Sequence, residues 1–245
     1  MLAKRFLETC IEVLTRVIDE QTAAIAASAE LIVDAIATGH RFFAFGCSHS
    51  GLPVQDVYYR AGGLILVNPI IPPGLTLDVR PPTMTSAIER MEGYGRVIFD
   101  SVPAQAGDVL VLLSTSGRNP VPIDVAMAAR ERGLKVIVIT SMLYTEAVST
   151  RHASGKKAHE FADVVIDNYS PVGDAVLDVP GLPQRTGSTS GIVGSALMHA
   201  IVSQVVEGLV ARGITPPIYV SGNLDGGAEH NARMLAEYAG QIHYL

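Results

Sequence analysis

Five continuous apolar runs constrain the fold of this chain more than any other feature of its sequence. They read RFFAFG (41–46), LILVNP (64–69), VLVLLS (109–114), KVIVIT (135–140) and DVVIDN (163–168). An unbroken apolar strand, rather than an alternating one, is typical of a strand that helices cover on both faces. Helical patterns separate most of the runs, over 52–61, 83–101, 120–132 and 156–161. We therefore predict an α/β fold, a doubly wound αβα sandwich with a five-stranded parallel sheet.

Helices flank this predicted core on both sides. Apolar residues recur at spacings of three and four over residues 2–38, and Gly39 then ends the pattern. Further helices are expected over 190–212 and 228–241. The 245 residues fit a single domain. We expect N-terminal helices over 1–38, the αβα core over 39–212, and a C-terminal tail with a helix over 213–245.

Composition limits the class of partner. Only 17% of the residues are charged and 48% are hydrophobic, which favours apolar surface buried between subunits, as in a homodimer or a dimer of dimers. The net charge is −6 and no Lys/Arg-rich run occurs, so we expect no nucleic acid partner. No stretch of about 18 apolar residues suggests a membrane span. Cys10 and Cys47 give no disulfide framework, and no signal peptide is evident, so a cytoplasmic location is expected.

Three predicted loops at strand ends or helix starts are rich in hydroxyl groups and glycine. They are FGCSHSG after the first strand, STSGRNP after the third, and TGSTSG before the long 190–212 helix. Backbone N–H groups at a helix start, together with hydroxyl donors, can hold a phosphate without a lysine. One such loop alone could be an ordinary capped turn. Three at one sheet edge favour an anion site, for which we predict as ligands Ser48, His49, Ser114, Thr115, Ser116, Asn119 and Ser188.

These motifs resemble a known family. FGCSHS, VLVLLSTSGRNP and KVIVIT, in that order, are similar to the SIS (sugar isomerase) domain, in which Ser-x-Ser-Gly after the third strand is the phosphate loop. YYRAGG, AIERMEGYG and GGAEHN resemble small bacterial single-domain members. The resemblance implies a flavodoxin-like fold, sugar phosphate binding, and a dimer with the site near the subunit interface. Phosphoheptose isomerases of this family bind zinc on the helix after the first strand. Gln55 and Asp56 occupy that helix here, so we expect no metal and no cofactor.

Aldose–ketose isomerisation needs a base that moves a proton between adjacent carbons. On one helix over 83–101, Glu92 falls at the edge of an apolar stripe and Glu89 further round. We therefore predict Glu92 as the base, with Glu89 next; the alternative is an exposed Glu92 paired with Arg96. His230, just inside a helix start, is predicted to open the sugar ring, reaching the site from the neighbouring subunit. It could instead be an ordinary exposed histidine.

The sequence thus favours a sugar-phosphate isomerase. One alternative is a lyase resembling N-acetylmuramic acid 6-phosphate etherase, suggested by TGST at 186–189. The other is a non-catalytic sugar-phosphate sensor. Cys47 and His199 are interpreted as packed core residues rather than as catalytic groups.

Overall fold

A five-stranded parallel sheet organises the computed structural model, which describes residues 1–244. Its strand order is β2-β1-β3-β4-β5, and every neighbouring pair is parallel. This is the flavodoxin-like order of doubly wound folds, and it confirms the predicted fold class. The strands are β1 (Phe42–Gly46), β2 (Val67–Ile70), β3 (Val109–Leu113), β4 (Lys135–Thr140) and β5 (Val164–Asp167).

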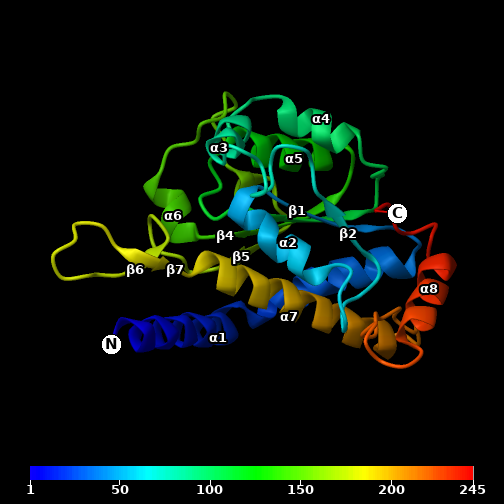
Figure 1. The fold of residues 1–245 in the computed structure, drawn as a ribbon. Helices are drawn as coiled ribbons and strands as arrows, with labels where there is room; N and C mark the ends of the chain where they lie inside the picture. Colours follow the sequence, from blue (N-terminus) through cyan, green and yellow to red (C-terminus); the bar gives the residue numbers. More distant parts are fainter. Residues whose placement is uncertain (245) are drawn as a thin grey trace.

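Helices cover both faces of the sheet (Figure 1). One layer contains the long helices α1 and α7 with α2, and the opposite layer contains α4 and α5. A short antiparallel hairpin, β6 with β7, precedes α7. The helices are α1 (Leu2–Ala37), α2 (Leu52–Val57), α3 (Thr83–Ile88), α4 (Tyr94–Asp100), α5 (Pro120–Glu131), α6 (Met142–Ala147), α7 (Ser190–Ala211) and α8 (Gly227–Glu237), the 3-10 turns are η1 (Ser48–Gly51) and η2 (Ala158–Phe161), and the hairpin strands are β6 (Ala175–Leu177) and β7 (Thr186–Ser188).

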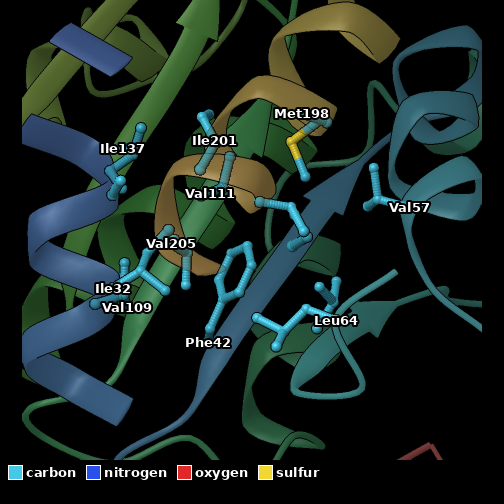
Figure 2. Packing of buried hydrophobic residues seen from close by; sticks show 14 of the residues in the cluster. Ile32, Phe42, Val57, Leu64, Val109, Val111, Ile137, Met198, Ile201 and Val205 are labelled. Atoms are coloured by element: carbon cyan, nitrogen blue, oxygen red, sulfur yellow. The ribbon is translucent and has the colours of Figure 1, made fainter. Parts of the chain in front are cut away.

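Alternate residues of each central strand pack into the two layers. Phe42 and Ala44 of β1 lie in the cluster formed with α1, α2 and α7, part of which Figure 2 shows. Phe43 and Phe45, their neighbours, lie in the cluster on the α4–α5 side. All five residues of β1 and of β3 are buried. Burial on both faces is therefore the reason that these strands are continuous apolar runs in the sequence.

The helix predicted over 83–101 is wrong as a single element. The structure divides it into α3 and α4, and Gly93 between them has a φ of +83°. Left-handed backbone of this kind ends a helix and favours glycine. The Gly93 N–H donates to the Asp124 carboxylate at 2.7 Å, which holds the turn against α5. The break rotates the residues before it relative to those after it, so one helical wheel does not describe them.

Other differences are smaller. The N-terminal extension is one uninterrupted 36-residue helix rather than several. The second strand begins at Val67, because Leu64 and Ile65 instead bond to the chain around Ile218. The predicted 52–61 helix ends at Val57, and the 156–161 helix is only the 3-10 turn η2. The β6–β7 hairpin was not expected from the sequence.

The helix α7 is long and apolar enough to cross a membrane if length and composition alone are considered. In the structure it packs along α1 and α2 and contributes Val193, Leu197, Met198, Ile201 and Val205 to the core. Figure 2 shows Met198, Ile201 and Val205 beside residues of β1 and β3. Its apolar character is therefore accounted for by its position in the core.

The core packing predicts an uneven sensitivity to truncation. Phe42→Ala should lower the free energy of unfolding by about 3–5 kcal/mol, because it leaves a cavity beside β1 and removes a fully buried ring. Leu143→Ala, at a position on α6 that is 59% exposed, should change it by about 0.5 kcal/mol or less. Urea denaturation of both variants measures the difference, and equal losses would contradict the assigned core.

Candidate functional site

The candidate site is a cavity at the carboxyl ends of β1 and β3. These strands are neighbours, and Gly46 pairs with Leu113 at their ends, so the loops that follow them lie side by side. The chain leaves β1 and β3 in opposite directions along the sheet, toward β2 and β4, which makes this the switch point where ligands bind in such folds. The cavity has a volume of about 530 Å³ and is lined by Cys47, Ser48, His49, Ser50, Glu89, Ser114, Thr115, Ser116, Tyr144, Gly173, Asp174, Ala175, Arg185, Thr186, Gly187, Ser188 and Ser190.

The loop after β3 is held in shape through its carbonyl groups. The Ser114 carbonyl accepts from Thr140 Oγ1 at 2.7 Å, and the Ser116 carbonyl accepts from Thr145 Oγ1 at 3.1 Å. The chain reverses at Gly117, whose φ is +62°. A Cβ atom there would lie 3.2 Å from Thr145 Oγ1, so the position favours glycine for both conformation and space.

Several hydroxyl groups that line the cavity make no hydrogen bond to the described part of the protein. Within residues 1–244, no protein hydrogen bond is made by the side-chain oxygens of Ser50, Ser114, Thr115, Ser116 and Ser188. The loop leads directly into α5, a 12-residue helix whose N-terminus adds positive potential. Several free donors and a helix N-terminus facing one cavity form a suitable site for an oxyanion such as phosphate.

Most of the predicted anion ligands meet at this cavity. Ser48, His49, Ser114, Thr115, Ser116 and Ser188 all line it. Asn119 lies just outside, where its side-chain oxygen accepts from Arg151 Nη1 at 2.9 Å. The Asn119 side chain also stabilises the charged form of the Glu89 carboxylate through a hydrogen bond.

The two candidate bases are placed the other way round from the prediction. Glu89 is partly buried and lines the cavity, whereas Glu92 is exposed and its carboxylate accepts the Ala153 N–H at 2.5 Å. The predicted burial of Glu92 is wrong because α3 ends at Ile88 and α4 begins only at Tyr94. Glu92 therefore lies in the turn between the two helices and not on the apolar face of a single helix. Glu89 is instead the C-cap residue that follows α3, and its carbonyl accepts the Val121 N–H of α5 at 3.1 Å.

Burial raises the pKa of the Glu89 carboxyl group. Asn119, Arg90 and Arg151 act in the opposite direction and stabilise its charged form, but burial is the largest cause. A carboxylate with a raised pKa beside a polar cavity is a good candidate for proton transfer near neutral pH. Glu89 is therefore the carboxylate that this geometry favours as a base.

His230 does not lie at the cavity of its own protomer. Its helix α8 is at the opposite end of the sheet from the β6–β7 hairpin (Figure 1). Its Nε2 atom is 3.1 Å from the Ile218 carbonyl, and its Nδ1 atom is 3.2 Å from Arg233 Nη2. Both ring nitrogens are thus engaged within the C-terminal region. A ring-opening role for His230 would require a neighbouring subunit and stays a prediction.

The polar residues of the cavity that sequence reasoning missed include Tyr144, Asp174 and Arg185. Asp174 accepts the N–H groups of Thr189 and Ser190 at 3.2 and 3.0 Å, and so fastens the start of α7 to the hairpin. Arg185 pairs with Asp178 at 2.9 Å across the hairpin. Tyr144 lies shortly after the end of β4. The expectation that ligands bind at the carboxyl ends of the strands could have identified it as a site residue. Asp174 and Arg185 had no such signal, because they belong to the unpredicted hairpin.

The residues of α2 do not fit the zinc site of phosphoheptose isomerases. Asp56 interacts with Arg60 at 2.5 Å and with His199 Nε2 at 3.1 Å, and Gln55 turns back to the Gly51 carbonyl. Among residues 1–244, no three His, Cys, Asp or Glu side chains converge. Burial raises the pKa of the Cys47 thiol well above its usual value, so at neutral pH this cavity-lining residue is a protonated thiol.

Comparisons with known proteins agree with this geometry. A family model described as the SIS domain matches residues 5–141. A UPF0309 protein of Streptomyces griseus is 48% identical over 244 residues, which cover 99% of this chain and 97% of that protein. UPF0309 protein ABC0887 of Shouchella clausii is 43% identical over 242 residues, with 99% and 98% covered.

Two solved structures share the fold. Phosphoheptose isomerase GmhA from Neisseria gonorrhoeae matches with a TM-score of 0.54 and 21% identity, over 83% of this chain and 97% of that one. A phosphoheptose isomerase from Francisella tularensis matches with a TM-score of 0.54 and 15% identity, over 84% and 96%. At these identities the likeness establishes the fold alone.

The burial of Glu89 predicts a pH-dependent stability difference. A raised pKa means that the folded protein binds the Glu89 proton more tightly than the unfolded chain does. Above the ordinary carboxyl pKa of 4.5, stability is therefore lost as pH rises through the folded-state pKa. Glu89→Gln removes this loss. Its free energy of unfolding, relative to the wild type, should increase between about pH 4 and about pH 8.

Urea denaturation across this pH range tests the prediction. Glu92→Gln is the matched control, because that residue is exposed, and its difference from the wild type should change less with pH. Parallel pH profiles for the wild type and Glu89→Gln would contradict the assigned environment of Glu89.

Proposed function

This chain belongs to the SIS domain family, and from that membership we propose that it binds a sugar phosphate and interconverts its aldose and ketose forms. The observation that carries the proposal is the single cavity where the free hydroxyl groups after β3 and the partly buried Glu89 lie together. The hydroxyl groups of Ser114, Thr115 and Ser116, with the N-terminus of α5, hold the phosphate. The rest of the sugar extends toward Glu89.

Glu89 then moves the proton. As a carboxylate it removes the proton from C2 of the open-chain aldose, and the electron pair forms the C1–C2 double bond of an enediol as O1 gains a proton. Glu89 returns its proton to C1 while O2 loses its own, which gives the ketose. The proton exchanges at the oxygens need a second group. His49 lines the same cavity, is exposed, and lies 3.4 Å from Ser48 Oγ through its Nδ1 atom, which makes it the candidate.

The lyase alternative rests on the hairpin. Thr186, Gly187 and Ser188 of β7 line the cavity, so the segment that resembles the etherase group faces the same ligand. A lyase would use the same carboxylate to remove a proton but would then expel a substituent. Release of that substituent, rather than formation of a ketose, distinguishes the two reactions.

We also propose that the protein acts as a homo-oligomer, a dimer or a dimer of dimers, in the cytoplasm. The N-terminal part of α1 extends past the sheet (Figure 1), and it carries Leu7, Ile11 and Ile18 at 62%, 63% and 67% exposure. These residues, four and seven apart, share one face of the helix. An apolar stripe of this spacing suits packing against α1 of a second copy. Cys10 and Cys47 are both free, which supports a reducing compartment.

The phosphate assignment predicts a loss of affinity. Ser116→Ala removes one charge-assisted hydrogen bond and should weaken binding of a sugar phosphate by about 1–3 kcal/mol. Ser203→Ala is the control, because that serine is exposed on α7 and does not line the cavity. Isothermal titration calorimetry with glucose 6-phosphate and fructose 6-phosphate measures both variants. Unchanged affinity in Ser116→Ala would refute the phosphate site.

The assigned base predicts a selective loss of turnover. Glu89→Gln keeps the shape of the side chain but cannot accept a proton, so exchange of deuterium at C2 should fall by about 10²–10⁴-fold while binding persists. Nuclear magnetic resonance in deuterated water follows the exchange, with Glu92→Gln as the matched variant. If Glu92→Gln loses exchange and Glu89→Gln does not, the base is Glu92. If the wild type exchanges no sugar phosphate that it binds, the sensor alternative is favoured.

The oligomer proposal is tested on α1. The triple variant L7K/I11K/I18K should convert the assembly to a monomer of 25.9 kDa, because each lysine charge would be buried in the interface between the two α1 helices. Light scattering measures the mass. A wild type that is already monomeric at micromolar concentration would contradict the proposal and would also remove His230 from the site.

A further inference from the structure

Three arginines form a cluster on the outer side of Glu89. Arg90 directly follows Glu89 in the chain. The Arg151 N–H donates to the Arg118 carbonyl at 2.9 Å, and the Arg151 side chain donates to Asn119 at 2.9 Å. The three positive charges are close enough to affect one another: burial and then the charges of Arg118 and Arg90 lower the pKa of Arg151. We refer to Arg90, Arg118 and Arg151 as the arginine cluster.

The arginine cluster is not neutralised by the protein. Within residues 1–244, none of its members forms an ion pair with an aspartate or a glutamate at 4.0 Å or less, whereas Arg96, Arg130 and Arg212 elsewhere all do. In the described part of the chain, the buried Nε atom of Arg118 has no hydrogen-bond partner, and its Nη2 atom reaches only Ser149 Oγ at 3.4 Å. Among the described residues, Glu89 is the carboxylate whose negative charge acts most on Arg151. Its single charge leaves the cluster positive overall.

Two members of the arginine cluster lie close in the chain to residues that line the cavity, although none of its three members is part of that lining. Arg118 lies two residues after Ser116 and Arg90 one residue after Glu89, and both of these neighbours line the cavity. Tyr144, a third lining residue, is close enough to act on the charge of Arg151. Guanidinium groups that repel one another and keep free donors are a strong site for a planar or tetrahedral oxyanion.

We propose that the arginine cluster binds a second oxyanion of the ligand, so that the substrate is a sugar phosphate that also carries a carboxylate or a second phosphate group. This inference rests on the proposed function, because the first phosphate is assigned to the hydroxyl groups after β3. Under this assignment Ser114, Thr115 and Ser116 hold one anion, the arginine cluster holds the other, and Glu89 faces the carbons of the sugar. Sugar phosphates with one anionic group would then bind more weakly than those with two.

Matched ligand pairs test the inference by calorimetry. Glucitol 6-phosphate and 6-phosphogluconate differ only in the carboxylate at C1, and fructose 6-phosphate and fructose 1,6-bisphosphate differ in a second phosphate. In at least one pair the wild type should bind the doubly anionic compound about tenfold more tightly or better. The pair that shows the preference identifies the second group as carboxylate or phosphate. The triple variant R90Q/R118Q/R151Q should lose this preference and keep its affinity for the singly anionic compound within about twofold.

Single variants test the inference even if the triple variant misfolds. Arg90 is exposed, so Arg90→Gln should fold and should reduce the preference alone, while Arg5→Gln on α1 should not. Equal affinities within both pairs in the wild type, or a preference that survives in R90Q/R118Q/R151Q, would overturn the inference and leave the phosphate site intact. Loss of the singly anionic compound in the arginine variants would assign these arginines to the first phosphate, and would also overturn it. If none of the four compounds binds the wild type, the proposed function fails together with the inference.

Discussion

The adjacency of β1 and β3 at the centre of the sheet is the constraint on which the rest of this structure depends. Their parallel pairing brings the loops after both strands to one edge, although about 70 residues separate them in the chain. The hydroxyl groups of Ser50 and Ser116 face one cavity only because of this pairing. Burial of both sheet faces then makes the edge rigid, since the strands beneath it have no exposed residue. The proposed phosphate site depends on that rigidity, because a serine side chain is short and cannot adjust to a misplaced ligand.

Much of this arrangement could be predicted from the sequence, because the signals are local. A continuous apolar run marks a doubly covered strand, and the hydroxyl-rich segment after it marks a loop at the carboxyl end. Six of the seven predicted anion ligands line the cavity, five of them for this reason, and the seventh, Asn119, lies just behind it. These five follow β1 or β3, whose positions were unambiguous, whereas Ser188 lies in β7 of the hairpin.

The position of the candidate base could not be predicted, because it depends on a single turn. Treating residues 83–101 as one helix placed Glu92 at the apolar edge and Glu89 outside. The αL backbone at Gly93 and the contact of its N–H with Asp124 reverse this order. Asp124 is 31 residues away in sequence, on α5, so no local pattern announces the contact. Asp174 and Arg185 were missed for a related reason: the hairpin that carries them is placed by its packing near α1 and α7 rather than by a strong strand signal.

The charges around Glu89 connect binding to chemistry. Burial raises the pKa of its carboxyl group, and the positive charges of Arg90 and Arg151 partly offset that effect. An oxyanion bound at these arginines would reduce the positive potential that stabilises the Glu89 carboxylate. The pKa of Glu89 would then rise further, and the carboxylate would become a stronger base when the ligand is in place. Without a ligand Glu89 would be more readily ionised, and under the proposed function the bound sugar would itself increase the tendency of that carboxylate to take a proton from carbon. The same arginines would therefore select a doubly anionic sugar and adjust the base that acts on it.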